Sequence, residues 1–167
     1  MKEHIFEADL WLPCPRTEMF PFFANAANLQ AITPPFLNFV VLTPEPIEMR
    51  AGAIIDYKLR VRGFPMRWRT LISAWEPPFR FVDEQVRGPY RQWIHEHTFE
   101  ERDGGTFMRD LVRDRVPGGA LIDRMFVRED VRRIFTFRRD ALLRLFSNSD
   151  TAGDSRETGG HYRRITR

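Results

Sequence analysis

Cysteine is almost absent from this chain. Cys14 is the only one, which excludes an internal disulfide and a metal framework built from several thiolates. Long apolar runs are absent too, since no stretch approaches the roughly 18 consecutive apolar residues that suggest a membrane-spanning helix. The first residues, Met1 to His4, lack the long apolar segment of a signal peptide. We therefore expect a cytoplasmic protein without stable membrane insertion, in which Cys14 is a small buried or half-buried side chain.

Lysine is scarce as well, and the basic residues are not clustered. Of the 26 basic residues only Lys2 and Lys58 are lysines, and the arginines are interleaved with Asp and Glu along the chain. The net charge is +3, but a nucleic-acid-binding surface needs a concentrated basic patch. We therefore expect no nucleic-acid partner.

Several catalytic signatures are missing from the sequence. It contains no Ser–His–Asp nucleophile elbow, no phosphate-binding glycine loop, no CxxC pair and no zinc motif. These absences argue against hydrolytic, nucleotide-dependent and redox chemistry. We expect no cofactor. Two histidines and a carboxylate, His95, His97 and Asp110, could form a metal site, but Cα atoms two residues apart on a strand lie about 6.5–7 Å apart, and nothing else in the sequence supports a metal. We therefore expect no bound metal.

What the chain does contain suits one globular domain. Its 167 residues, 43% of them hydrophobic, are enough for one well-formed core. Apolar periodicity and turn residues divide the chain into strands and helices. The predicted strands cover residues 4–11, 36–43, 53–62, 66–75, 79–86, 92–101 and 105–116. The predicted helical regions are 16–32, as one or two short helices broken near Asn25, and 120–147 as one long helix.

The first clear hairpin spans residues 53–75. Apolar side chains alternate along both strands, which is the pattern of a half-buried sheet, and arginines populate the opposite face. We place the turn at Arg62 to Pro65. The inner-face pairs predicted from this turn are Val61–Met66, Leu59–Trp68, Tyr57–Thr70 and Ile55–Ile72.

A second hairpin, residues 92–116, turns at Asp103-Gly104, which is a strong signal for a two-residue turn. If these two residues form the turn, the inner-face pairs are Phe99–Met108, His97–Asp110, His95–Val112 and Trp93–Asp114. A slip to a Gly104-Gly105 turn would change the partners but not the faces. This face carries most of the aromatic and apolar bulk of the hairpin. His95, His97 and Asp110 form a polar group within it, and ligand sites are commonly built from a few polar groups in an apolar wall.

The long helix has an apolar stripe that contains a charge. The stripe consists of Val127, Val131, Ile134, Arg138, Leu142 and Leu145. A guanidinium in this position must either reach solvent or meet an acid. Asp110, Asp114 and Asp83 are the candidate partners of Arg138. Such a pair would hold the helix against the sheet, and it could also receive an acidic ligand headgroup.

The order of these elements indicates the fold class. The strands follow one another without intervening helices, so the sheet is antiparallel and the class is α+β. We expect a curved sheet of about six to seven strands around the long C-terminal helix, with two short helices after the first strand. Residues 1–147 form this domain, and the polar residues 148–167 are predicted to be a flexible tail.

Several segments carry a resemblance to a known superfamily. They are Trp68-Arg69-Thr70-Leu71-Ile72, Phe81-Val82-Asp83-Glu84-Gln85, Gly88-Pro89-Tyr90, Trp93-Ile94-His95-Glu96-His97-Thr98-Phe99, Asp103-Gly104-Gly105-Thr106 with Asp110, and Phe135-Thr136-Phe137-Arg138-Arg139 with Leu142. Together with the element order they resemble bacterial members of the SRPBCC or START-like superfamily over residues 1–147. The resemblance implies a helix-grip fold, and it is nearest to a subgroup of ligand-binding proteins labelled polyketide cyclase or dehydrase by similarity. Because this superfamily binds, transports and catalyses on one scaffold, function has to be argued from the site.

The predicted function is binding of a small hydrophobic molecule, such as a lipid, a polyketide-like compound or an aromatic compound, between the sheet and the long helix. The predicted ligand-binding residues are Tyr57, Trp68, Ile72, Phe81, Trp93, His95, His97, Met108, Asp110, Val112, Phe135 and Arg138. Filled cores and ligand cavities use the same residue types. The pattern alone therefore leaves open which of these side chains contact a ligand.

Two other functions remain open from the sequence. A cyclase- or dehydratase-type enzyme would use His97 as a general base, with Asp110 setting the imidazole tautomer. A protein-interaction module would instead have a filled core and an exposed apolar patch. A histidine paired with a cross-strand carboxylate is also a common structural arrangement. The oligomeric state and the identity of the ligand are left open as well.

Overall fold

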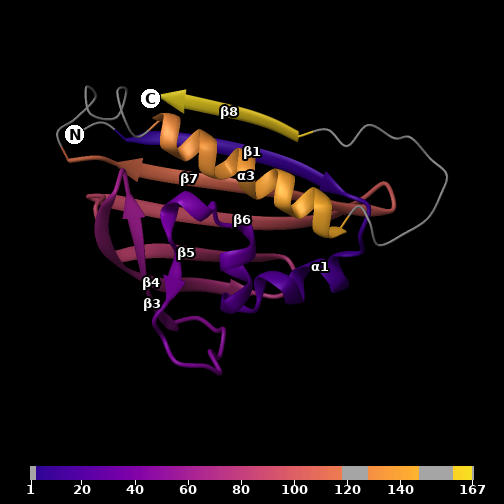
Figure 1. Ribbon diagram of the computed structural model, residues 1–167. Helices are drawn as coiled ribbons and strands as arrows, with labels where there is room; N and C mark the ends of the chain where they lie inside the picture. The colour runs from indigo at the N-terminus through magenta and orange to yellow at the C-terminus, as the bar shows by residue number, and fades with distance from the viewer. Residues whose placement is uncertain (1–2, 118–127, 147–159, 167) are drawn as a thin grey trace.

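The computed structural model describes residues 3–117, 128–146 and 160–166. Within these residues eight strands form one antiparallel sheet (Figure 1). The strands are β1 (His4–Leu12), β2 (Val40–Val41), β3 (Ile54–Val61), β4 (Phe64–Glu76), β5 (Arg80–Arg87), β6 (Gln92–Arg102), β7 (Gly105–Arg115) and β8 (Gly160–Thr166). Their order across the sheet is β2-β3-β4-β5-β6-β7-β1-β8.

In the described part of the chain, three short helices and one long helix accompany this sheet. They are α1 (Arg16–Phe23), the 3₁₀-helices η1 (Ala26–Ile32) and η2 (Pro35–Leu37), and α3 (Arg128–Phe146). The helix α3 contacts β1 and η1 (Figure 1). None of the described helices combines the length and apolar character needed to cross a membrane. The predicted α+β class, with short helices after the first strand and a long helix after the last hairpin, is confirmed.

The break between the first two helices lies where the sequence predicts it. The Asn25 side chain accepts a hydrogen bond from the backbone N–H of Ala27 at 3.0 Å. This is an N-cap, so the chain leaves α1 and starts η1 at this asparagine. The predicted helical region is therefore two separate helices, with Asn25 as the N-cap of the second.

The hairpin of β6 and β7 has the predicted register. Its cross-strand partners include Phe99–Met108, His97–Asp110, His95–Val112 and Trp93–Asp114. Asp103 and Gly104 have φ values of 53° and 74°, which are the left-handed conformations that a tight two-residue hairpin turn requires. The turn thus determines which side chains of both strands face the interior.

The hairpin of β3 and β4 is two residues out of the predicted register. The observed partners are Val61–Phe64, Leu59–Met66, Tyr57–Trp68 and Ile55–Thr70. The turn consists of Arg62 and Gly63 alone, with φ values of 52° and 84°, whereas the prediction extended it to Pro65. The predicted partners are wrong, but a shift of two residues keeps every side chain on its face.

Residues 36–43 form less strand than predicted. The helix η2 occupies the start of the segment, and only Val40 and Val41 pair with β3. Pro35 takes the first helical position, where its fixed φ and missing N–H are tolerated. Asn38 adopts a left-handed φ of 43°, which ends η2. The two prolines therefore override the β-branched and apolar character of the segment at its start.

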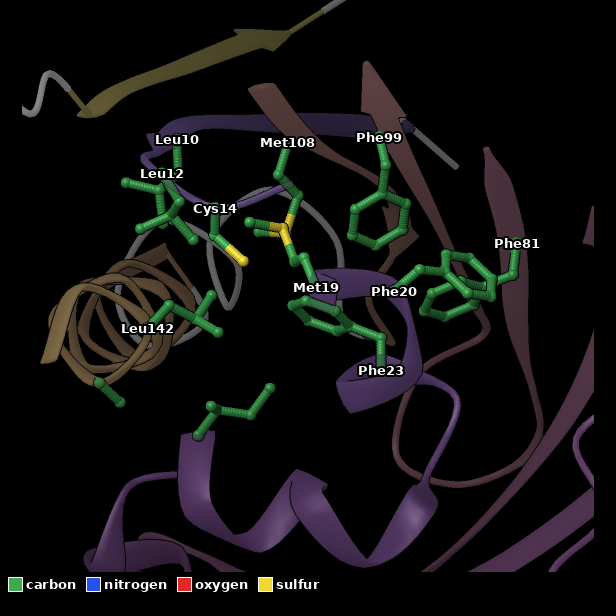
Figure 2. Close-up of a cluster of buried hydrophobic side chains, with 12 residues drawn as sticks. Leu10, Leu12, Cys14, Met19, Phe20, Phe23, Phe81, Phe99, Met108 and Leu142 are labelled. Atoms are coloured by element: carbon green, nitrogen blue, oxygen red, sulfur yellow. The ribbon is translucent and has the colours of Figure 1, made fainter. Parts of the chain in front are cut away.

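The main core lies between β1, β7, α1 and α3 (Figure 2). The residues of β1 alternate between buried and half-buried along its whole length. The buried members of this core are Leu10, Leu12, Cys14, Met19, Phe20, Phe23, Ile32, Phe81, Phe99, Met108, Ala141 and Leu142. Figure 2 shows Leu142 of α3 facing Leu10 and Leu12, with Cys14 beside them. Cys14 is thus a buried core residue, as expected.

The helix α3 presents the predicted stripe to the sheet, except in its last turn. Arg138 and Leu142 are buried, but Leu145 is 45% exposed, so its predicted place on the buried stripe is wrong. Leu143 and Phe146 pack on the core instead. The buried face therefore moves around the helix toward its C-terminal end.

The predictions for the C-terminal part of the chain have a mixed outcome. Residues 120–127 and 147 of the predicted helix, and residues 148–159 and 167 of the predicted tail, lie outside the described residues. The seven residues Gly160–Thr166, predicted to be flexible, instead form β8 and pair antiparallel with β1. Without β8, one edge of β1 would expose unpaired backbone N–H and C=O groups. The prediction of a flexible segment is wrong for these residues because that edge supplies hydrogen-bond partners that the sequence pattern does not show.

The packing of α3 generates a test of the core. Leu142 is fully buried, so we expect Leu142→Ala to lower the free energy of unfolding by about 2–5 kcal/mol. Leu145 lies on the same helix but is 45% exposed, and we expect Leu145→Ala to change it by less than about 0.5 kcal/mol. Urea denaturation of both variants measures the two values. Equal losses would contradict the described rotation of the buried face.

Candidate functional site

A cavity of about 450 Å³ lies inside the fold. Side chains from α1, η1, η2, β3, β4, β5, β6 and α3 form its wall, and most of them are aliphatic or aromatic. The volume falls in the range of about 300–1,000 Å³ that is typical of small-molecule sites. The interior is thus divided into a filled core and an open cavity.

Nine of the twelve predicted ligand-binding residues line this cavity. They are Tyr57, Trp68, Ile72, Phe81, Trp93, His95, His97, Phe135 and Arg138. They come from five different elements of the fold. The structure therefore brings together most of the side chains that the sequence placed on one interior face.

The other three predicted residues, all on β7, do not line the cavity. Met108 belongs to the main core, and Val112 packs in a second buried cluster with Phe135. Asp110 lies behind the two histidines and contacts their far side. Met108 and Val112 share one cause: side chains of α1 and α3 pack on this part of the sheet, so these side chains of β7 are enclosed rather than open.

Sequence reasoning missed several parts of the cavity wall. The short helices contribute Phe23, Leu29, Ile32, Phe36 and Leu37, and the strands contribute Ile55, Leu59, Thr70 and Asp83. The alternation of β3 already placed Ile55 and Leu59 on the same face as Tyr57, so that signal was present. No pattern in the sequence indicated that the short helices close one end of the cavity.

Five charged or titratable side chains meet beside the cavity, and all of them except Asp110 line it. Asp83 on β5 lies opposite His95 on β6, and His97 lies opposite Asp110 on β7. Arg138 reaches this group from α3. Because β5, β6 and β7 are neighbours in the sheet and α3 lies over them, residues far apart in sequence form one cluster.

Each imidazole of the cluster contacts both carboxylates. His97 Nε2 lies 2.9 Å from Asp83 Oδ2, and its Nδ1 lies 2.7 Å from Asp110 Oδ1. His95 Nε2 lies 3.0 Å from Asp110 Oδ1, and its Nδ1 lies 3.5 Å from Asp83 Oδ2. Asp110 thus holds one nitrogen of each ring from behind, while the other nitrogen of each ring faces Asp83.

The pKa values of the cluster follow from burial and from these neighbours. Burial raises the pKa of Asp110, but the charges of Arg138 and His97 and the hydrogen bonds of both histidines outweigh it and hold that pKa well below its usual value. Burial also opposes the ionisation of Asp83, and the two histidines lower its pKa despite this. Both carboxylates are therefore ionised.

The two histidines differ in their protonation. Burial lowers the pKa of His97, but its contacts with Asp110 and Asp83 outweigh burial and leave that pKa raised. Burial, and then the charge of His97, lowers the pKa of His95. These shifts favour the charged form of His97 and the neutral form of His95. In those forms, together with Arg138 and two carboxylates, the cluster has no net charge.

Arg138 meets one of its three predicted partners, Asp110. Its Nε lies 3.5 Å from Asp110 Oδ2. Its Nη2 lies 3.3 Å from His97 Nδ1, but the 2.7 Å contact of that nitrogen with Asp110 requires a proton on it. The guanidinium and the imidazolium therefore share Asp110 as their common counter-ion.

Aromatic rings hold the two imidazoles in place. Phe81 stacks on His97, with ring centroids 4.1 Å apart and an interplanar angle of 19°. Phe135 packs its ring against His95 at 5.6 Å, and Trp93 approaches the same ring at 6.4 Å. These contacts limit rotation of both rings, so the positions of their nitrogens are well defined.

A second polar point lies on the β3–β4 side of the cavity. The hydroxyl groups of Tyr57 and Thr70 are hydrogen-bonded to each other, and Trp68 donates its Nε1–H to Thr70 Oγ1 at 3.1 Å. Burial, together with the negative charge of Asp83, raises the pKa of Tyr57. Tyr57 therefore stays a neutral phenol that can donate to, or accept from, a bound molecule.

The geometry limits what the cluster does as an acid or base. A general base needs an open lone pair directed at its substrate. Both nitrogens of His97 face carboxylates, so neither directs an open lone pair at a substrate. The arrangement instead presents a carboxylate, Asp83, and two fixed imidazoles at the cavity wall.

The sequence matches no protein-family model, and no curated protein matches it either. Several solved structures nevertheless share its fold. Protein CV1439 from Chromobacterium violaceum is 14% identical with a TM-score of 0.67, and the match covers 87% of this chain and 98% of that chain. Protein Ms6760 from Mycobacterium smegmatis is 17% identical with a TM-score of 0.65, over 87% of this chain and 92% of that chain.

A plant protein has the same architecture. Ginseng major latex-like protein 151 from Panax ginseng is 8% identical with a TM-score of 0.66, and the match covers 87% of this chain and 99% of that chain. At such low identities these likenesses show the fold and no activity. They support the helix-grip architecture that the sequence resemblance implied.

The buried ion pairs of the cluster generate a stability test. Removing the charge of Asp110 leaves Arg138 and His97 without their shared counter-ion, so we expect Asp110→Asn to lower the free energy of unfolding by about 3–5 kcal/mol. The matched control is Asp9→Asn on the neighbouring strand β1, which breaks an exposed pair with Arg109 and should cost less than about 1 kcal/mol. Chemical denaturation measures both. A small loss for Asp110→Asn would mean that the cluster does not hold α3.

Proposed function

We propose that this protein binds a small hydrophobic molecule in the cavity between the sheet, the short helices and α3. The observation that carries the proposal is the cavity itself, about 450 Å³ with a mostly apolar wall. A predominantly apolar pocket with a few converging polar groups is the usual form of a small-molecule site. The proposed partner is therefore a small molecule, in agreement with the sequence-based prediction.

The composition of the wall favours a ligand with a flat or aromatic part. Tyr57 and Trp68 stack with their rings 6.2 Å apart, and Trp93 and Tyr90 approach Trp68 at 5.6 Å each. Such rings offer large apolar surfaces that contact a planar molecule well. Among the predicted classes, an aromatic or polyketide-like compound fits this wall better than a plain aliphatic chain.

The polar points of the cavity supply orientation. Tyr57 and Thr70 present hydroxyl groups on one side, and Asp83 with the two histidines lies on another. A ligand with a hydroxyl or carbonyl group can hydrogen-bond at these points while its apolar body fills the rest. We infer that the bound molecule is amphipathic rather than a pure hydrocarbon.

The alternatives left open by the sequence are less well supported. A protein-interaction module was expected to have a filled core, and the cavity argues against it. An enzyme of the cyclase or dehydratase type would use His97 as its base. However, His97 lies between two carboxylates, which raise the pKa of its imidazole. Binding without turnover is the function that the geometry supports best.

The first experiment identifies a bound molecule directly. We expect native mass spectrometry of the purified protein to show an added mass that disappears on denaturation, because an amphipathic ligand in an apolar cavity is retained during purification. Extraction and analysis of the released compound then give its class. A protein that shows only its own mass, and that no compound of a hydrophobic probe library stabilises against heat, would contradict the proposal.

A variant that fills the cavity tests where binding occurs, with 8-anilino-1-naphthalenesulfonate fluorescence as the probe. Leu59 lines the cavity, and Leu59→Trp adds a bulky ring to its wall, so we expect the dissociation constant to rise at least about tenfold, equivalent to 1.4 kcal/mol. The control is Phe64→Ser, because Phe64 is 70% exposed outside the cavity. We expect that variant to bind like the wild type.

The two variants separate cavity binding from surface binding. If Phe64→Ser abolished the fluorescence and Leu59→Trp did not, the dye would be bound on the exposed apolar surface. Melting temperatures of both variants establish that each is folded. Loss of binding in Leu59→Trp alone supports the cavity.

A further inference from the structure

Three side chains at the cavity wall converge in a way that the binding of a hydrophobic molecule does not explain. One ligand-type atom each from Asp83, His95 and His97 lies within 4.8 Å of the other two. The closest approaches are 2.9 Å from His97 Nε2 to Asp83 Oδ2 and 3.5 Å from His95 Nδ1 to the same oxygen. The three groups thus surround one point at the surface of the cavity.

The backbone explains why these atoms meet. His95 and His97 are two residues apart on β6, so their side chains leave the strand on the same face. Asp83 lies directly opposite His95 on the neighbouring strand β5. The two imidazole rings are close, with centroids 3.8 Å apart. Two strands therefore deliver two nitrogens and one carboxylate to one place without any loop.

Asp110 orients both histidines from the far side. Its Oδ1 lies 3.0 Å from His95 Nε2 and 2.7 Å from His97 Nδ1. In metal sites of proteins, the nitrogen that does not bind the metal usually donates to a carboxylate, which sets the tautomer and the ring orientation. One buried carboxylate here performs that task for two rings at once.

We propose that Asp83, His95 and His97 bind one divalent transition-metal ion, through Asp83 Oδ2, His95 Nδ1 and His97 Nε2, with open coordination positions facing the cavity. Two imidazoles and one carboxylate suit iron, zinc, nickel or copper, whereas calcium and magnesium prefer oxygen ligands. Metal–ligand distances of about 2.0–2.2 Å require only small side-chain movements from the observed separations. His97 must release its proton from Nε2 when the ion binds.

The surrounding charges favour a cation at this point. With both imidazoles neutral, Asp83 and Asp110 contribute two negative charges and Arg138 one positive charge, which leaves the cluster with one net negative charge. Arg138 contacts Asp110, the carboxylate behind the rings, so Asp83 keeps its charge directed at the site. Binding of a divalent ion therefore changes the net charge of the cluster from one negative to one positive charge.

The sequence predicts that no metal is bound. The convergence of Asp83, His95 and His97 is the reason to test that prediction. That prediction paired the two histidines with Asp110 as the third possible ligand and relied on the wide Cα spacing along a strand. The structure places Asp83 in the third position instead, and the side chains converge although the backbones do not. The proposal is independent of the organic ligand proposed above.

The test uses the full chain, freed of metal with a chelator and carrying no affinity tag, titrated with Co²⁺ and Zn²⁺. We expect one equivalent of Co²⁺ to produce visible ligand-field absorption and Zn²⁺ to displace it. We expect Asp83→Asn and His95→Ala to weaken Zn²⁺ binding at least about 100-fold, because each removes a ligand, and Asp110→Asn to weaken it about 10–100-fold. The control His161→Ala, on β8, should bind like the wild type.

A second measurement on the wild type alone guards against unfolded variants. In ¹⁵N-histidine-labelled protein, we expect one equivalent of Zn²⁺ to shift the ring signals of His95 and His97 and to leave those of His4 and His161 unchanged. Shifts confined to His161, or Co²⁺ binding without ligand-field bands at one equivalent, would overturn the proposal. The proposal would also fail if Asp83→Asn, shown to be folded by circular dichroism, bound Zn²⁺ as tightly as the wild type.

Discussion

The contact between Arg138 and Asp110 is the constraint on which the interior of this protein depends. A guanidinium on the core side of a helix is tolerated only where an acid meets it, because an unpaired buried charge is very costly. Asp110 is almost fully buried and lies on β7, between β6 and β1 in the sheet. The pair therefore sets where α3 crosses the sheet, and it also holds the two histidines that share Asp110.

The position of α3 divides the interior into two parts. Over β1 and β7, side chains of α1 and α3 interdigitate with the sheet and fill the space, as Leu142 does against Leu10 and Leu12 (Figure 2). Toward β3 and β4 the short helices cover the sheet less closely, and the cavity remains. The charged cluster lies at the boundary, where Asp83 and the imidazoles border the cavity while Asp110 is enclosed. A polar group at such a boundary is well placed to meet the polar end of a ligand or an ion.

The accuracy with which the sequence predicted the register of each hairpin depended on the residues of its turn. Asp103-Gly104 is a strong signal for a two-residue turn, and the observed β6–β7 register is the one that this turn predicts. Arg62-Gly63 forms the same kind of turn, but Pro65 next to it indicated a longer turn, and the predicted β3–β4 partners were two residues off. The strand predicted over residues 36–43 is shorter in the structure because prolines override strand propensity at residues 34–37. The strand β8 was missed because its pairing depends on an open sheet edge rather than on its own pattern.

The sequence by itself determined which side chains share a face, because the two-residue period of a strand sets this locally. It was enough to place His95, His97 and Asp110 together and to require an acid for Arg138. Only the tertiary structure decided that Asp83 completes the group, since its place opposite His95 depends on the register between β5 and β6 and on the strand order. It also decided which interior residues line a cavity and which fill the core, because that depends on how closely the helices cover the sheet. No local pattern encodes that distance.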